Sequence, residues 1–543
     1  MKVFIGGAWP YANNSLHVGH LAALLPGDVI ARYYRKKGDE VIYVSGTDSH
    51  GTPITERAKK ENVHPSQISL MYHEEFDSCF KNLDFSYDLY TKTSDDYHKK
   101  EVQKMFLDIV ENGYIYSKTE DQDFCLSCNS FLSDREIEGV CPYCGGLAKG
   151  DQCDQCFRTL NAKEINDKHC ITCGNKTVQK ENTHLYFALS KFQEGLQKLV
   201  DKNADNWRLH AITETLKYLK DGMPDRAATR QLSWGVDTPL EGYDDKKIYV
   251  WIEAVLGYLT ACKKVCEEKG INFEDFIKDS EDLKTYYVHG KDNIPFHTVI
   301  FPSLLLAMKK NIKLPDYIIS SEYVNVDDEK ISKSKGNGVT INDLIKDYTS
   351  DTIRYYMISN GPEKKDVNFS YEDLEQRHNK FLVGEYGNFV NRNLAFLAKK
   401  FDGVVPSGEM DEEVKDAIIK TYEMVGKNIE AGNLRVAISL IMELVQIANK
   451  YYDNERPWIQ VKEDINSFNN TTYTCINLMI NIANMLEPFI PTSSAKVRNM
   501  LGITETSWNY ISAPQNIILN NVEVLYNRID VPKESMKLTR NKK

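Results

Sequence analysis

Two histidines near the start of the chain have the spacing of a phosphate-binding site. His17 and His20 follow a short apolar run and open a stretch with apolar residues at helical spacing. The N-terminus of a helix presents free N–H groups and the positive end of its dipole, which favour phosphate, and residues three apart share one face of the first turn. Gly19 lets a flat ligand approach the backbone closely. Two imidazoles there can donate hydrogen bonds to oxygens that gain charge during a transfer reaction, although the pair alone fits two surface histidines equally well.

A lysine-rich segment much further along the chain suits a leaving pyrophosphate. Lys330 and Lys333 lie in Lys330-Ile-Ser-Lys-Ser334, and Lys335-Gly-Asn-Gly338 follows. The flanking glycines predict a movable loop, and two lysines on a closing loop can neutralise phosphates. Such a pentamer alone is more often an exposed basic loop. Together with the two upstream histidines it indicates nucleotide chemistry.

Eight of the twelve cysteines form four Cys-x-x-Cys pairs within one short region. The pairs are Cys125/Cys128, Cys141/Cys144, Cys153/Cys156 and Cys170/Cys173. Thiolates at this spacing are typical ligands of structural zinc, four to each tetrahedral site. The N-terminus does not resemble an export signal, so disulfides are not expected. We therefore expect two Zn²⁺ ions with closed coordination, which stabilise the fold and take no part in catalysis.

The order of the cysteine pairs favours a nested arrangement. Eight residues separate Cys144 from Cys153, so the middle pairs can close one knuckle and the outer pairs the other. A sequential pairing, first with second and third with fourth, remains open. An iron–sulfur cluster would use the same thiolates, but the glycine turn after Cys144 is typical of a zinc knuckle. The remaining cysteines are expected to be buried free thiols: Cys79, Cys262, Cys266 and Cys475.

The first hundred residues alternate strand and helix patterns that could position these groups. Lys2–Gly7 and Glu40–Ser45 are expected strands, and between them His17–Lys37 is an expected helix. Gly38 would end this helix and Pro26 would bend it. Such repetition predicts an α/β fold with a doubly wound, Rossmann-like parallel sheet. Further strands are expected at Lys247–Trp251, Tyr286–His289 and Tyr317–Ser320.

Two other regions differ from this pattern. Residues 118–182 lose long apolar periodicity, which predicts a small insert held by metal instead of a core. Beyond about Tyr371 the periodicity is helical, as in Leu434–Lys450 and Tyr473–Met485. This predicts an all-α bundle after the catalytic domain.

Composition limits the class of protein. The 543 residues are 42% hydrophobic and 27% charged, which is enough for several cores. No stretch is as long and apolar as a membrane span, so no membrane partner is expected. The clustered cysteines and the lack of an export signal lead us to expect the cytoplasm. The net charge of −11 gives no support to nucleic-acid binding by overall charge, although a local basic patch can still bind it.

The two motifs, in this order, resemble the paired signature of class I aminoacyl-tRNA synthetases. The segments around them are similar to those of methionyl-tRNA synthetases, from about residue 3 to about residue 530. The matching segments are Ala8–Asn13, Thr47–Pro53, Tyr249–Ala254, Gly290–His297, Arg354–Tyr356 and Tyr451–Trp458. The resemblance implies ATP-dependent activation of L-methionine to methionyl adenylate. Transfer to the 3′ end of methionine tRNA, initiator and elongator, would follow, with Mg²⁺ bound alongside ATP.

The resemblance implies a role for each matching residue. ATP would contact His17, His20, Lys291, Asp292, Lys330 and Lys333, and both histidines and the last two lysines would act in catalysis. Methionine would contact Ala8, Trp9, Tyr11, Asp48, Arg230, Trp251, Ala254, Tyr258 and His297. Asp48 would bind the ammonium group, and aromatic rings suit a polarizable sulfur. The anticodon would be read by Asn388, Arg392 and Trp458, since an exposed tryptophan can stack on an unpaired base.

The same resemblance implies a domain order. The catalytic domain would comprise 1–117 and 225–320, separated by a connective insert at 118–224 with its zinc knuckles at 118–182. In the family this insert lies over the active site near the tRNA acceptor end. A linking domain with the lysine loop (321–379), an anticodon-binding bundle (380–527) and a basic tail (528–543) would follow. The family's optional C-terminal tRNA-binding or dimerization domain is not expected, and a monomer is therefore predicted.

Three departures from the family pattern lie near the implied methionine pocket. Trp9 stands where leucine is more usual, Val255 where bacterial members have proline, and Asn293 where an apolar residue is expected. We expect unchanged amino-acid choice but altered sensitivity to methionine-competitive inhibitors.

Other classes of protein account for the sequence less well. The isoleucine, valine and leucine synthetases carry a large editing insertion, and the cysteine enzyme holds zinc in its active site. A non-catalytic RNA-binding paralogue would not need intact histidines and lysines in both motifs. A smaller nucleotidyltransferase with the same histidine motif would not need a helical bundle.

Overall fold

The computed structural model describes the chain except for residues 133–135, 150–154, 157–163, 327–328, 331–337 and 532–543. Two compact units are present. The first contains Met1–Val102, Phe192–Gly222 and Trp251–Lys543, and the second contains Gln103–Lys191 and Met223–Val250. In the part of the chain that is described, no helix is long and apolar enough to cross a membrane.

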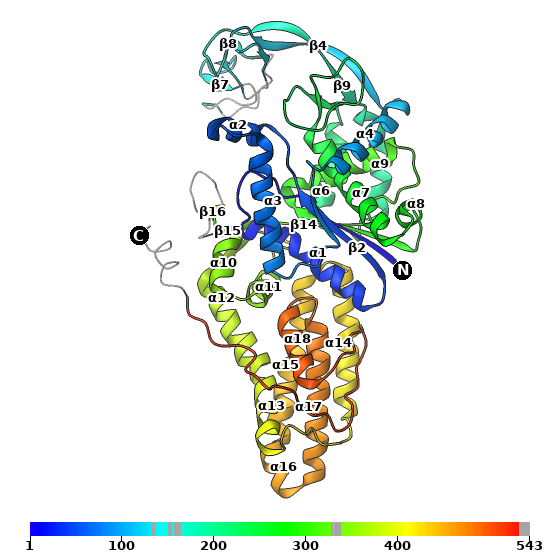
Figure 1. Cartoon of the computed structure of the whole chain (residues 1–543), viewed down its shortest axis with the longest axis vertical. Helices are drawn as coiled ribbons and strands as arrows, with labels where there is room; N and C mark the ends of the chain where they lie inside the picture. Colours follow the sequence, from blue (N-terminus) through cyan, green and yellow to red (C-terminus); the bar gives the residue numbers. More distant parts are fainter. Residues whose placement is uncertain (133–135, 150–154, 157–163, 327–328, 331–337, 532–543) are drawn as a thin grey trace. The chain divides into compact units, whose positions relative to one another are not determined.

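A five-stranded parallel sheet, to which β2 and β14 in Figure 1 belong, forms the centre of the first unit. Its strand order is β14-β13-β1-β2-β3. Its strands are β1 (Lys2–Gly7), β2 (Glu40–Thr47), β3 (Leu89–Lys92), β13 (Leu283–Gly290) and β14 (Tyr317–Ser321). The chain builds outward from β1 to one side and later from β13 to the other, so the strand order reverses between these two. Ligands of open α/β sheets bind at the carboxyl ends of the strands flanking such a switch point. The predicted doubly wound, Rossmann-like sheet is confirmed.

Helices cover this sheet, and α1 (Val18–Lys36) packs against β13 and β2. Gly38 follows it with a φ of +82°, as the predicted helix end requires. The other helical segments that precede the linking region in the sequence are α2 (Thr52–Glu61), α3 (Pro65–Asn82), α4 (Asp96–Glu111), η3 (Leu189–Phe192), α5 (Gln193–Lys202), α6 (Leu209–Asp221), α7 (Val250–Lys269), α8 (Phe273–Ile277), η4 (Lys291–Asn293), η5 (Phe296–Ile300) and α9 (Phe301–Ala307).

A small linking region leads from the sheet to the predicted helical bundle, which is confirmed. The linking elements are β15 (Val324–Val326), β16 (Glu329–Lys330), α10 (Ile341–Asp347), α11 (Ser350–Ser359), β17 (Val367–Phe369) and α12 (Tyr371–Arg377). The bundle elements are η6 (His378–Gly387), α13 (Asn388–Lys400), α14 (Glu412–Glu430), α15 (Leu434–Glu455), α16 (Pro457–Glu463), α17 (Ile465–Leu486) and α18 (Pro491–Leu501).

One fully buried arginine, Arg354, connects the linking region with helix α1 and with the bundle. The guanidinium of Arg354, on α11, donates to Asp28 Oδ2 of α1 at 2.6 Å and to the carbonyl oxygen of Leu83 at 3.0 Å. It also donates to the carbonyl oxygens of Pro488 (2.9 Å) and Phe489 (2.8 Å) in the bundle. Both charged groups are completely buried, so this arginine ties α11 to α1 by an ion pair and to the bundle by two backbone hydrogen bonds.

The second unit is built on a long antiparallel ribbon, β4 (Ile115–Cys125) with β9 (Val178–Phe187). Its other strands are β5 (Ser130–Phe131), β6 (Ile137–Val140), β7 (Leu147–Lys149), β8 (Asn166–Cys170), β10 (Arg226–Ala227), β11 (Thr229–Arg230) and β12 (Lys247–Ile248). The predicted strand Lys247–Trp251 is wrong beyond Ile248, since helix α7 begins at Val250. Two residues of the apolar run pair with β11, and the rest forms the first turn of a buried helix.

Candidate functional site

The two motif histidines lie at the N-terminus of α1, which follows β1 in the sequence, and hydrogen bonds to the backbone of the first turn orient both rings. His17 is the N-cap, and its Nδ1 accepts the backbone N–H of Gly19 at 3.1 Å. Nδ1 of His20 accepts the backbone N–H of His17, also at 3.1 Å. A neutral imidazole whose Nδ1 accepts carries its proton on Nε2. Both rings, with centroids 3.9 Å apart, are therefore oriented as Nε2–H donors at the N-terminus of the helix.

A cavity of about 360 Å³ lies at the carboxyl ends of β1, β13 and β14. It brings together residues of the phosphate motif and of the implied methionine site from five separate segments. The sequence-predicted residues that line it are Ala8, Trp9, Tyr11, His17, His20, Asp48, Trp251 and Asp292. Glu322 and Tyr323 line it as well, and the motifs gave no signal for them. The cavity thus occupies the switch point of the sheet, where a nucleotide fits.

Asp48 is a buried carboxylate at one side of this cavity, only 3% exposed. Burial raises its pKa well above the usual range, and the nearby charge of Glu253 raises the pKa further. Among the described residues of the first unit, no lysine or arginine forms an ion pair with Asp48. A buried carboxylate of this kind gains most from a ligand that brings its own positive charge.

Two tryptophans form part of the cavity wall. The indole of Trp9 lies in a slot between Gly46 and Gly257, where an added Cβ would approach the ring within 2.5 and 2.8 Å. Trp251 stacks on Phe296 with ring centroids 3.9 Å apart and an interplanar angle of 8°. The cavity wall on this side is therefore aromatic.

The remaining implied methionine residues lie elsewhere. Ala254, Tyr258 and His297 are buried and do not line the cavity. Nε2 of His297 accepts the Tyr258 hydroxyl at 2.7 Å, its Nδ1–H donates to the carbonyl oxygen of Asn293 at 2.8 Å, and burial lowers its pKa to about 4. Arg230 belongs to the second unit, where it donates to two backbone carbonyls and lies over the ring of Tyr249.

A lysine and several carboxylates lie after β13 and β14, on the side of the cavity where the resemblance implies ATP. Lys291 follows β13 and donates to Glu322 at 2.8 Å and Asp366 at 2.6 Å. Burial would lower its pKa, but these two carboxylates outweigh burial and raise it. The hydroxyl of Tyr323 donates to Asp292. The lysine is thus neutralised by carboxylates in the structure.

The lysine loop begins and ends beside the cavity. Lys330 lies at the end of β16, which pairs with β15, and Val324 of β15 lines the cavity. After the loop, the carbonyl oxygen of Val339 accepts the backbone N–H of Val18, next to His17. Lys333 lies outside the described residues.

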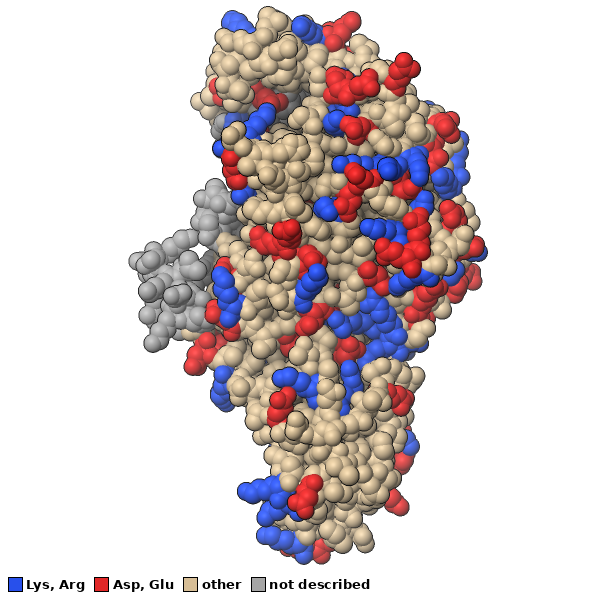
Figure 2. Space-filling view, viewed as in Figure 1, with Lys and Arg blue, Asp and Glu red and all other residues tan. Residues whose placement is uncertain are grey.

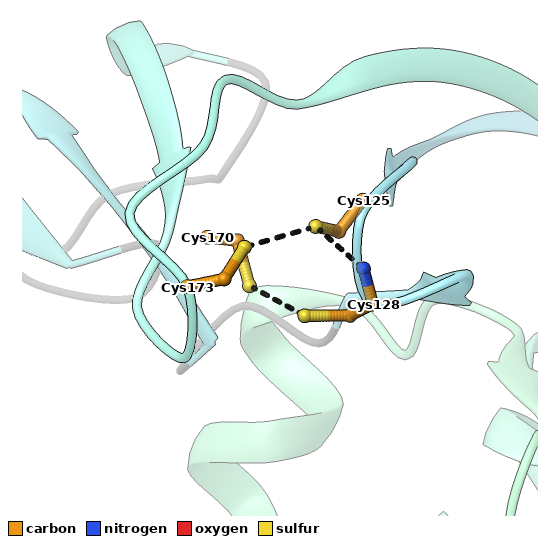
Figure 3. A group of neighbouring side chains, drawn as sticks. All are labelled: Cys125, Cys128, Cys170 and Cys173. Carbon is orange, nitrogen blue, oxygen red and sulfur yellow. Dashed lines mark hydrogen bonds between the residues drawn. The ribbon is translucent and has the colours of Figure 1, made fainter.

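The cysteines form two clusters in the second unit, and the nested arrangement is confirmed. The outer pairs bring together Cys125, Cys128, Cys170 and Cys173, and the middle pairs Cys141, Cys144 and Cys156 (Figure 3 shows the outer cluster). In both clusters all sulfur atoms lie within 4.8 Å of one another. Cys153 lies outside the described residues.

The two clusters could each hold a metal ion, and their sulfur spacing can be compared with that of tetrahedral zinc sites. Four sulfurs at ~2.3 Å from a central ion lie about 3.8 Å apart. The measured Sγ–Sγ distances are 3.4 Å for Cys125/Cys173, 3.9 Å for Cys128/Cys170 and 3.9 Å for Cys141/Cys156.

The turns after three of the four pairs share one conformation. Asn129, Gly145 and Gly174 each follow the second cysteine of a pair with φ between +50° and +73°, a region that glycine and asparagine tolerate. The backbone then folds back, and the carbonyl oxygens of Cys141 and Cys170 accept the N–H groups of Gly145 and Gly174. Each of these three turns therefore needs a residue, glycine or asparagine, that tolerates a positive φ.

The implied anticodon residues belong to α13 and to α16, which lies at one end of the bundle (Figure 1). Asn388 is exposed at the start of α13, and Trp458 is 42% exposed on α16. Arg392 donates a hydrogen bond to Asp453 at 2.7 Å, and its guanidinium lies over the ring of Tyr452. The ring centroids of Tyr452 and Trp458 are 5.7 Å apart. Figure 2 shows lysine and arginine side chains gathered at this end. An exposed aromatic ring beside basic groups can bind unpaired RNA bases.

Sequence reasoning missed a polar network beneath the cavity. Glu253, His50 and His98 come from three segments and are all buried. Glu253 lies inside an apolar run, and the histidines belong to no motif, so no local signal connects them.

Comparison with known proteins identifies the family. The family described as tRNA synthetases class I (M) matches residues 3–394, and the anticodon binding domain of methionyl tRNA ligase matches residues 404–533. Methionine–tRNA ligase 1 of Alkaliphilus oremlandii is 48% identical over 530 residues, which cover 98% of each chain. Methionine–tRNA ligase of Bacillus cereus is 48% identical over 536 residues, covering 98% of this chain and 97% of that one.

A solved structure agrees in fold. The crystal structure of Mycobacterium tuberculosis methionyl-tRNA synthetase bound by methionyl-adenylate has a TM-score of 0.79 and 24% identity, covering 97% of this chain and 100% of that one. Fold and cavity, with the family matches, define a class I aminoacyl-tRNA synthetase. Within this class, the chain belongs to the methionyl-tRNA synthetase family.

Proposed function

We propose that this chain activates L-methionine with ATP and transfers it to methionine tRNA, both initiator and elongator, for protein synthesis. The observation that carries the proposal is the switch-point cavity, which combines a helix N-terminus and two Nε2–H donors with a buried carboxylate. ATP phosphates match the first two features. An amino-acid ammonium group matches the carboxylate.

In the first step, a methionine carboxylate oxygen attacks the α-phosphorus of ATP, and the bond to the pyrophosphate oxygen breaks. The step needs positioning and charge stabilisation more than a protein nucleophile. His17 and His20 donate to the phosphate oxygens, Lys330 and Lys333 neutralise the leaving pyrophosphate, and Lys291 and Asp292 hold the nucleotide. Mg²⁺ bound with ATP would supply further positive charge to the phosphates.

Asp48 orients the substrate by its ammonium group. Tyr11, Trp9 and Trp251 contact the thioether side chain from the cavity, whereas Tyr258 and His297, with Ala254, support this wall from behind. Arg230 would meet the carboxylate side. In the second step, the terminal ribose hydroxyl of the tRNA attacks the adenylate carbonyl, and AMP leaves.

The other parts of the chain serve tRNA binding and stability. Asn388, Arg392 and Trp458 read the anticodon, and two Zn²⁺ ions hold the cysteine clusters without entering the chemistry. We infer a monomer that acts in the cytoplasm, where its tRNA is used. We also propose the domain order given by the sequence: a catalytic domain divided by the connective insert, then the linking domain, the anticodon-binding bundle and the basic tail.

Amino-acid-dependent ATP–pyrophosphate exchange, measured with each of the standard amino acids, tests the proposal. Exchange with methionine alone is expected. Exchange with another amino acid would contradict the assignment of the cavity to methionine. No exchange from folded, zinc-loaded protein would favour an RNA-binding role of the bundle without catalysis.

A further inference from the structure

One lysine on the nucleotide side of the cavity is enclosed by acidic and aromatic groups. The Nζ atom of Lys291 donates to Oε2 of Glu322 at 2.8 Å and to Oδ1 of Asp366 at 2.6 Å. It also lies 3.8 Å from the centroid of the Tyr323 ring, and the face of an aromatic ring attracts a cation. Glu322 and Tyr323 line the cavity, whereas Lys291 does not, and its side chain is only 15% exposed. The ammonium group therefore belongs to the wall of the cavity.

The two carboxylates that bind this lysine are fixed by other contacts. Oε1 of Glu322 is hydrogen-bonded to Nδ1 of His210 at 2.6 Å. Oδ1 of Asp366 accepts the backbone N–H of Tyr323 at 2.9 Å in addition to the lysine. A phosphate can bind Lys291 only by taking it from both carboxylates, which would then lie unpaired beside a polyanion. The lysine is therefore poorly placed to serve as a phosphate ligand.

The side chain of Tyr323 connects this lysine with a carboxylate of the cavity. Its ring lies under the ammonium group, its backbone N–H is held by Asp366, and its hydroxyl donates to Oδ1 of Asp292. Asp292 lines the cavity. A carboxylate repels phosphates but accepts hydrogen bonds from neutral hydroxyls, so the ribose of ATP suits it better than the phosphates do. Tyr323 thus fixes the direction of Asp292, while the lysine and Asp366 fix Tyr323.

We propose that Lys291 is a positioning residue for the ribose of ATP and not a phosphate ligand. Paired with Glu322 and Asp366, it holds the ring of Tyr323, whose hydroxyl orients Asp292 toward the ribose hydroxyls. The inference rests on the proposed function, in which Lys291 and Asp292 hold the nucleotide, and it gives each of them a separate part. Only Asp292 touches the substrate, and Lys291 acts through its neighbours.

A charge-balanced double variant, Lys291→Met with Glu322→Gln, tests the inference. It removes one positive and one negative charge, so the net charge beside the cavity stays that of the wild type. ATP–pyrophosphate exchange with methionine gives the KM for ATP and the KM for pyrophosphate separately. The KM for ATP should rise about tenfold, the effect of losing one hydrogen bond to a charged group, while the KM for pyrophosphate and that for methionine stay within about twofold.

The contact with the ribose is tested directly with 2′,3′-dideoxy-ATP, which has the phosphates but lacks both hydroxyls. The wild type should prefer ATP to this analogue in kcat/KM. The double variant should lose about tenfold of that preference, because Asp292 is no longer oriented. Tyr323→Phe keeps the ring for the lysine but removes the hydroxyl, so it should lose the same preference. Combining all three substitutions should add little, since they act through one contact.

Further single variants separate this role from general damage to the fold. Lys291→Arg keeps a cation between the two carboxylates and should recover most of the affinity and preference for ATP. Lys346→Met is the matched control: it removes an exposed lysine paired with Asp343 at 3.2 Å, and it should change neither KM nor the preference. Tyr323→Phe loses a single hydroxyl and keeps the test available if the double variant does not fold.

Three results would overturn the inference. The first is a KM for pyrophosphate that rises as much as the KM for ATP, because Lys291 would then contact phosphates. The second is a preference for ATP over the dideoxy analogue that is absent in the wild type or unchanged in the double variant. The third is strict additivity with Tyr323→Phe. Absence of methionine-dependent exchange in the wild type would instead contradict the proposed function.

Discussion

Replacing Arg354 with methionine should destabilise the first unit by about 3 kcal/mol. Removing one partner of a fully buried ion pair typically costs about 3–5 kcal/mol, because the other charge stays buried. The lower end applies because Asp28 keeps hydrogen bonds from Arg32 at 2.9 Å and from the backbone and hydroxyl of Ser86 at 2.7 Å each.

The same substitution should change the response to acid. Burial would raise the pKa of Asp28, but Arg354, Arg32 and Ser86 outweigh burial and lower it to about 2, against about 3.9 in the unfolded chain. A lowered pKa contributes stability above the unfolded value, and the contribution is lost as pH falls through the folded value. The stability difference between wild type and variant should therefore shrink below about pH 4.

Hydrogen exchange of amides in α1 and α11, the helices that carry Asp28 and Arg354, measures the cost. Arg35→Met is the control on the same helix as Asp28, since the partly exposed pair of Arg35 with Asp88 should contribute less than about 1 kcal/mol. The double variant with Asp28→Asn should lose at least about 1 kcal/mol less than the sum of the single variants. A cost below 1 kcal/mol for Arg354→Met, or strict additivity, would refute the role of this ion pair.

Three further substitutions probe other parts of the chain. Trp458→Ala should raise the KM for methionine tRNA about tenfold, from a stacking energy of ~1–3 kcal/mol, with ATP–pyrophosphate exchange unchanged; equal effects on both assays would contradict it. Cys128→Ser should lower bound zinc, measured by mass spectrometry, from two ions to one, and two retained ions would argue against the outer site. Asn481→Leu should cost about 2–4 kcal/mol in urea unfolding, because its buried amide bonds Tyr422 and both backbone groups of Ile511; a neutral result would show that these bonds are dispensable.

The parts that the sequence predicts are those set by local patterns. The spacing of His17 and His20 is enough to place both on the first turn of α1, and the interval between Cys144 and Cys153 favours the nested clusters. The expected strand ending at Trp251 fails because an apolar run of this length does not distinguish a strand from a buried helix. Glu253 and His98 could not be connected, since they meet only through tertiary packing of α7 against α4.

The two sides of the cavity differ in how their charge is balanced. On the nucleotide side, Lys291 already contacts Glu322 and Asp366, so a phosphate must compete with two carboxylates for this lysine. On the other side, Asp48 is buried, and burial together with the charge of Glu253 raises its pKa, so a positively charged ligand would stabilise the ionised carboxylate. An ammonium group therefore gains more from entering its site than a phosphate gains from Lys291 alone. At the helix N-terminus, His17 and His20 add their own donors to the phosphate side of the proposed site.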